Sequence, residues 1–146
     1  MKNSNSKENL KIDVLAFSPH PDDAELGCGG LLLKLKDIGY TTGIIDLTEA
    51  ELSTNGSIKI RYAEAQKASL ILKLDLRYNL NLGDCRIENN FESRLKIINI
   101  IRKFKPNMII MPYRQDRHPD HENSYKLIKD ACFISGLEKF KTDEVF

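Results

Sequence analysis

One imidazole and three carboxylates lie within the six-residue segment His20 to Glu25. The segment follows an apolar run, residues 12–17, whose pattern predicts a buried strand. Charged groups at the end of a buried strand are costly unless they are paired, hydrogen-bonded or bound to a metal ion. The segment is therefore a candidate site.

A second cluster of the same residue types lies about a hundred residues further along the chain. Asp116, His118, Asp120 and His121 follow another apolar run, residues 108–111, which also predicts a strand. All 3 histidines of the chain fall in these two clusters. Imidazole and carboxylate groups suit zinc, so the two clusters predict one shared metal site.

The first cluster can be divided between metal binding and proton transfer. A proline-containing turn separates His20 from Asp23 and can aim both side chains at one ion. Asp22, between them, would point elsewhere and could take a proton from water at the metal. The simpler alternative is helix capping by Asp22 or Asp23, with Glu25 as a first-turn acid.

In the second cluster, His121 could complete a His/Asp/His set that leaves an open position for water. His118 would then be a spare imidazole. Asp120 could hydrogen-bond it and keep it protonated, facing a developing oxyanion. The alternative is that these histidines are surface residues of a polar loop.

The order of the predicted elements indicates an α/β fold with a mostly parallel sheet, because strands alternate with helices. Strands are expected near residues 12–18, 42–47, 77–80 and 108–111, and helices near 31–38, 58–72, 91–104 and 122–135. Ligands of such sheets bind beyond the carboxyl ends of the strands, where both clusters lie. We expect residues 1–10 to be a flexible tail and residues 11–146 to form one domain.

Composition excludes several classes of partner. Hydrophobic residues make up 41% of the 146 residues and charged residues 29%, and the formal net charge is +1. This balance is typical of a soluble globular protein and argues against nucleic acid or an anionic membrane recognised by bulk charge. No apolar run is long enough to cross a bilayer and the first residues are polar, so we expect a cytoplasmic protein.

Glycines 27, 29 and 30 after a strand raise a second possibility, a nucleotide-binding α/β protein, with Asp46 as the acid on the ribose. The spacing is not that of the dinucleotide motif. Carboxylates also occupy the turn where a pyrophosphate would lie, and they would repel it. We therefore interpret the glycines as positions of close packing between a helix and a strand.

Residues 20–27, together with residues 118–121, resemble the motifs of the zinc-dependent LmbE-like (PIG-L type) de-N-acetylases. Residues 46–56 and 111–118 are similar to the bacillithiol-biosynthesis deacetylase branch. The resemblance implies a Rossmann-like three-layer fold and a Zn²⁺ cofactor, with Fe²⁺ as a possible replacement. It implies removal of an acetyl group from an N-acetylglucosaminyl substrate, which within that branch is N-acetylglucosaminyl-malate.

The resemblance also implies roles for individual residues. The metal ligands would be His20, Asp23 and His121. Asp22 would be the general base, and His118, with Asp120 as its partner, would stabilise the tetrahedral intermediate or protonate the leaving amine.

Two arginines match positions that line the substrate pocket of this family, Arg61 and Arg117. Their guanidinium groups suit the carboxylates of malate. The alternative is ordinary surface charge and, for Arg61, a helical pair with Glu64. Three residues of the loop after the second predicted strand would contact sugar hydroxyls: Glu51, Ser53 and Asn55.

Family members continue well past residue 146, so we expect a fold that is C-terminally short relative to the family. The unpaired sheet edge that this leaves would favour a homo-oligomer. Two other function classes therefore stay open. One is a catalytically weak metal- or sugar-binding relative, which would hold metal without turnover. The other is the nucleotide-binding protein, which would bind a dinucleotide.

Overall fold

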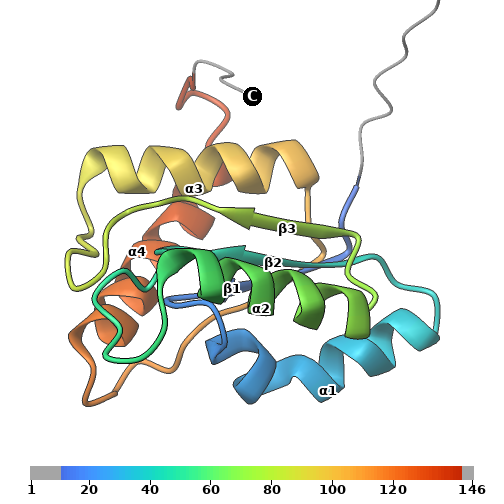
Figure 1. Ribbon diagram of the computed structural model, residues 1–146. Coiled ribbons are helices and arrows are strands. Elements are labelled where there is room, and N and C mark those ends of the chain that lie inside the picture. Colours follow the sequence, from blue (N-terminus) through green and yellow to red (C-terminus); the bar gives the residue numbers. More distant parts are fainter. Residues whose placement is uncertain (1–10, 143–146) are drawn as a thin grey trace, which may run out of the picture.

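A computed structural model describes residues 11–142, so the expected tail at residues 1–10 lies outside the described residues. Within that range one sheet of four parallel strands has the order β3-β2-β1-β4 (Figure 1). The strands are β1 (Val14–Ser18), β2 (Thr42–Asp46), β3 (Leu76–Asn79) and β4 (Met108–Ile110). The helices are α1 (Asp23–Asp37), α2 (Ile58–Ile71), α3 (Phe91–Phe104) and α4 (Pro119–Ser135).

Two layers of helix cover the sheet because its central strands are apolar on both faces. All residues of β1 and β2 are buried. Side chains alternate between faces along a strand, so Leu15 and Phe17 pack with α3 and α4 while Val14 and Ala16 pack with α1. Figure 1 shows α1 and α2 on one side of the sheet and α3 on the other. The predicted α/β three-layer fold is confirmed.

Helix α1 begins at Asp23, well before the expected start near residue 31. Glycine-rich residues 27–30 carry no apolar stripe, so the sequence did not indicate a helix there. The first turn is held by other contacts: the Leu26 N–H donates to the Asp22 carbonyl at 2.9 Å and the Ala24 N–H to Ser18 Oγ at 3.1 Å. This early start brings the first-turn carboxylates of α1 to the end of β1.

The sequence indicated that the glycines of α1 pack against a strand. In the structure they do not. A Cβ added at Gly29 would lie 3.6 Å from Leu72, the C-cap residue of α2, and one added at Gly27 or Gly30 would meet nothing within 4 Å. Only Gly29 therefore lies in a close approach, and it is an approach of one helix to another.

Helix α4 also begins earlier than expected, at Pro119 rather than Glu122. Proline suits the first helical position because its missing N–H would be unsatisfied there in any case. His118 is the N-cap, and its Nδ1 accepts from the Asp120 N–H at 3.2 Å. The early start places Asp120 and His121 in the first turn.

No helix among residues 11–142 has the length and apolar character needed to cross a membrane.

We predict that Gly43→Ala destabilises the protein by about 1–3 kcal/mol, because it overpacks the sheet. A Cβ on Gly43 would lie 3.0 Å from Leu76 Cβ, 3.2 Å from the Leu76 carbonyl and 3.2 Å from Leu15. Gly30→Ala is the matched control: it adds the same methyl group in open space within a helix, where alanine is favoured by roughly 0.5–1 kcal/mol. Urea unfolding of both variants measures the difference, and equal stabilities would contradict the packing argument.

Candidate active site

The parallel sheet brings four connecting segments to one edge, where the carboxyl ends of the strands lie. His20 follows β1, the loop with Glu51 follows β2, Asp84 follows β3, and His121 lies in α4, which follows β4. Side chains from three of these segments meet at His20, whose ring lies 4.8 Å from that of His118 and 5.6 Å from that of His121, centroid to centroid.

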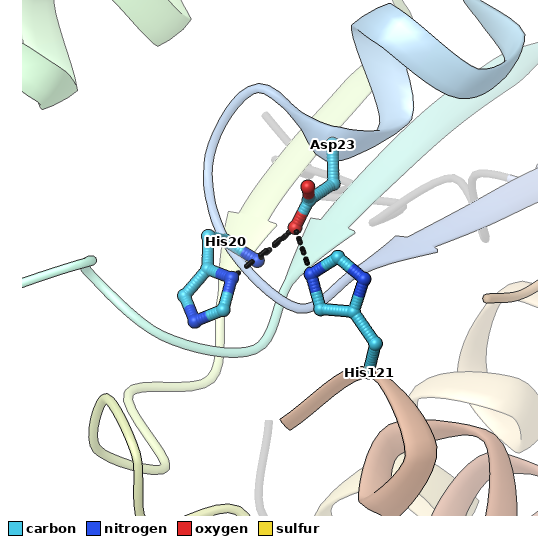
Figure 2. Close-up of side chains that lie close together, drawn as sticks. All are labelled: His20, Asp23 and His121. Atoms are coloured by element: carbon cyan, nitrogen blue, oxygen red, sulfur yellow. Dashed lines mark hydrogen bonds and ion pairs between the residues drawn. The ribbon is translucent and has the colours of Figure 1, made fainter. Parts of the chain in front are cut away.

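One carboxylate oxygen of Asp23 joins the two clusters. Asp23 Oδ2 lies 3.2 Å from His20 Nδ1 and 3.2 Å from His121 Nε2 (Figure 2). The same oxygen accepts the backbone N–H of His20 at 3.0 Å. The two histidines that the sequence keeps far apart therefore face one another across a single carboxylate.

This donor set fits a divalent metal. The ligand-type atoms of His20, Asp23 and His121 all lie within 4.8 Å of one another. Around tetrahedral zinc, with bonds of about 2.0–2.2 Å, ligand atoms are roughly 3–3.5 Å apart. The observed separations of 3.2 Å from Asp23 to each imidazole nitrogen match this spacing.

The surroundings of His20 are strongly anionic. Its Nε2 lies 3.2 Å from Asp84 Oδ1 and 3.1 Å from Asp120 Oδ2, and both aspartates are buried. Burial disfavours the imidazolium, but Asp23, Asp84 and Asp120 together raise the pKa of His20 to about 9. Burial likewise opposes ionisation of Asp23, yet the hydrogen bond from His20 and the charge of His121 lower the pKa of this carboxyl. Three carboxylates around one imidazole leave an excess of negative charge that suits a cation.

Asp22 precedes Asp23 and is not among the residues whose ligand-type atoms converge. It occupies the N-cap position of α1, but its side chain makes no capping hydrogen bond. Its Oδ2 instead accepts from Arg61 Nη1 at 2.6 Å, so Arg61 pairs with Asp22 and not with Glu64. The backbone of Asp22 has φ 121°, a region that favours glycine, and such strain of about 1–3 kcal/mol is concentrated at functional sites.

The partner expected for His118 is wrong. The Asp120 carboxylate accepts from the Cys85 N–H at 2.8 Å and contacts His20 Nε2, while only the Asp120 backbone reaches His118. Because His118 Nδ1 accepts that backbone N–H, the neutral ring carries its hydrogen on Nε2. The Asp120 carboxylate is therefore not the partner of His118, and Nε2 is the ring nitrogen of His118 that remains for another contact.

The residues expected to bind substrate are placed unevenly. Glu51 Oε1 accepts the Asp84 N–H at 2.8 Å, and its Oε2 is buried without a hydrogen-bond partner. Ser53 is half-buried, Asn55 and Arg117 are exposed, and their side chains make no hydrogen bond within residues 11–142. Of the five residues expected to bind substrate, the structure brings Arg61 and Glu51 to the site by direct contacts with Asp22 and Asp84.

Sequence reasoning missed Asp84 and Arg77. Asp84 follows a weak strand with no histidine nearby, so no spacing pattern marks it. Arg77, on β3, donates to Asp46 Oδ2 at 2.7 Å and Oδ1 at 3.0 Å, and it also pairs with Glu25. Burial raises the pKa of Asp46, although Arg77 opposes this. The sequence carried no clear signal for this network, because β3 has the sequence Leu-Arg-Tyr-Asn and is not an apolar run in which one arginine would stand out.

A cavity of about 290 Å³ adjoins the site between α2 and the ends of β2 and β3. It is lined by Pro21, Asp46, Glu49, Ile58, Tyr62, Ala65, Gln66, Arg77, Tyr78 and Asn79. Pro21 stands between His20 and Asp22, so the cavity borders the loop that carries the candidate catalytic residues.

Residues 15–132 match the model of the GlcNAc-PI de-N-acetylase family, PIG-L. The chain belongs to this family. It is 31% identical over 142 residues to the diacetylchitobiose deacetylase of Thermococcus kodakarensis, covering 90% of this chain and 53% of that protein. The chain thus spans about half the length of this curated relative.

Two solved structures of PIG-L relatives share the fold. The conserved protein TT1542 from Thermus thermophilus superimposes with a TM-score of 0.87 at 41% identity, over 90% of this chain and 60% of that one. The N,N'-diacetylchitobiose deacetylase from Pyrococcus horikoshii, complexed with an inhibitor, superimposes with a TM-score of 0.82 at 29% identity. This match covers 88% of this chain and 52% of that one. The bacillithiol branch expected from the sequence is not distinguished by these relatives.

We predict that the metal-free protein loses stability as the pH rises through about 9, because the folded state holds a proton on His20 that the unfolded state releases near 6.5. This contribution is fully present below pH 6.5 and is lost above 9. Urea unfolding with a chelator at pH 6, 7.5 and 9 measures it. His20→Gln should give a flatter pH dependence, and an unchanged slope would contradict the assignment.

Proposed function

We propose that this chain is a metal-dependent de-N-acetylase that hydrolyses the acetamide of an N-acetylglucosaminyl substrate. The observation that carries the proposal is the convergence of His20, Asp23 and His121, with Asp22 next to Asp23 and paired with Arg61. A bound divalent metal, Zn²⁺ or Fe²⁺, would polarise the amide carbonyl and make water more acidic. The three converging residues would hold it.

Asp22 is the proposed general base. Arg61 holds one carboxylate oxygen of Asp22 at 2.6 Å, and the Asp22 side chain is 49% exposed, so water can reach this residue. A base must lie within hydrogen-bond reach of the proton that it accepts, and an ion pair fixes its direction. Asp22 would take the proton from the attacking water and hold it for the leaving amine.

His118 is the proposed donor to the developing oxyanion. Its Nδ1 is occupied by the Asp120 backbone N–H, which leaves the Nε2 hydrogen to point at substrate. A preorganised donor of this kind stabilises charge that develops only in the transition state.

The PIG-L relatives support a sugar substrate. Two of them are named as deacetylases of diacetylchitobiose, an N-acetylated sugar. The cavity beside Pro21 offers polar groups and the Tyr62 ring for a sugar or its aglycone. Within this class we propose N-acetylglucosaminyl-malate, because Arg61 uses one nitrogen on Asp22 and keeps other N–H groups for a carboxylate.

We predict that Asp22→Asn retains the metal and loses about 10²–10⁴-fold in kcat, the range typical of general acid–base catalysis. His121→Ala should lose the metal as well as the activity, because only two ligands would remain. Metal analysis beside an amine-release assay on N-acetylglucosaminides separates the two. Full activity of Asp22→Asn would contradict the assignment of Asp22 as the general base. Metal without turnover in the unsubstituted chain would support the catalytically weak relative.

We predict that Arg117→Gln raises KM for N-acetylglucosaminyl-malate roughly tenfold or more and leaves KM for diacetylchitobiose unchanged. A hydrogen bond to a charged group contributes about 1.5–3 kcal/mol, and only the first substrate carries carboxylates. Arg117 is exposed and makes no hydrogen bond within residues 11–142, so the fold should tolerate the change. Equal effects on both substrates would contradict recognition of malate by Arg117.

A further inference from the structure

Nε2 of His20 faces the buried carboxylates of Asp84 and Asp120. Asp84 has no role in the catalysis proposed above. We infer that Asp84, in the loop after β3, is a positioning residue that sets the metal affinity of the site by orienting His20. The inference rests on the proposed function, because it concerns the metal centre proposed there.

The two nitrogens of His20 face in different directions. Nδ1 lies 3.2 Å from Asp23 Oδ2, on the side shared with His121. Nε2 lies 3.2 Å from Asp84 Oδ1 and 3.1 Å from Asp120 Oδ2. If Nδ1 gives its lone pair to a metal, Nε2 must carry the ring hydrogen and needs an acceptor. Metal-binding histidines are usually held in this way by a carboxylate.

Asp84 is itself rigidly held. It is 5% exposed, its Oδ2 accepts the Leu52 N–H at 3.0 Å, and its own N–H donates to Glu51 Oε1 at 2.8 Å. These reciprocal bonds tie the loop after β3 to the loop after β2. One carboxylate oxygen is therefore anchored to backbone, which leaves the other, Oδ1, fixed toward His20.

The shape of the loop also serves this placement. Gly83 has φ 91° and Cys85 has φ 57°, so left-handed residues flank Asp84 on both sides. The Cys85 N–H in turn donates to Asp120 Oδ2 at 2.8 Å. The loop thus supplies one acceptor for His20 directly and orients the second through its backbone.

The test measures metal affinity of the full chain rather than turnover. The protein is stripped with a chelator and titrated with Zn²⁺, and with Co²⁺ for its absorption spectrum, against a competing chromophoric chelator. Loss of a carboxylate that orients a metal ligand typically weakens binding about 10- to 100-fold, which we expect for Asp84→Ala. The metal affinity of Asp84→Asn should lie between those of the unsubstituted chain and Asp84→Ala. The amide oxygen of asparagine can still accept the His20 N–H, but it carries no charge.

Asp13→Ala is the matched control. The Asp13 carboxylate also anchors backbone, accepting the Thr41 N–H at 3.0 Å and the Thr41 hydroxyl at 2.8 Å, but it lies before β1, at the opposite end of that strand from His20. Its loss should lower the unfolding temperature and leave metal affinity unchanged. This variant separates a general loss of stability from an effect on His20.

The possible outcomes test the proposed metal centre and the role of Asp84 separately. If the unsubstituted chain takes up neither metal, the proposed function fails. If it binds metal and folded Asp84→Ala binds within about twofold of it, the role of Asp84 is wrong while the metal centre stands. Should Asp84→Ala not fold, Asp84→Asn decides, and affinity equal to that of the unsubstituted chain would overturn the inference.

Discussion

The pairing of β1 with β4 is the constraint on which the candidate site depends. Val14 pairs with Met108 and Ala16 with Ile110, and the two strands run in the same direction. The segments that follow them therefore emerge at the same edge of the sheet. If the strands were antiparallel, α4 would begin at the opposite edge. Parallel pairing thus allows one oxygen of Asp23 to contact both His20 and His121.

The apolar sheet stabilises a site that is electrostatically unfavourable by itself. Buried carboxylates are costly to desolvate, and Asp84 and Asp120 are 5% and 1% exposed. Backbone N–H groups from Leu52 and Cys85 offset part of this cost, and His20 offsets more. A divalent cation bound at Nδ1 of His20 would balance the remaining negative charge. Metal binding and folding should therefore be coupled in this protein.

The fold and the meeting of the two clusters could be predicted from sequence because both follow from periodic patterns. Alternating strands and helices imply a parallel sheet, and that sheet decides which loops are neighbours. The side chains of His20, Asp23 and His121 lie where this argument places them. The order of the strands and helices was sufficient for this prediction.

The details that sequence did not predict depend on single dihedral angles and cap geometry. The carboxylate of Asp120 contacts His20, while the ring of His118 is the N-cap of α4 and accepts from the helix backbone. Asp84 reaches His20 through a loop whose direction is set by left-handed residues, Gly83 and Cys85. Hydrophobic periodicity carries no information about either feature.

The Arg77 network argues against the nucleotide-binding alternative. Both oxygens of Asp46, the expected ribose acid, are occupied by Arg77, which is only 5% exposed. The same guanidinium pairs with Glu25 in the first turn of α1, where a pyrophosphate would need unpaired N–H groups and no acids. Because desolvating both charges offsets much of the attraction in a buried ion pair, we interpret this pair as fixing the arrangement of the elements that it joins. Here that arrangement joins β2, β3 and the start of α1, the helix turn that carries Asp22 and Asp23 into the site.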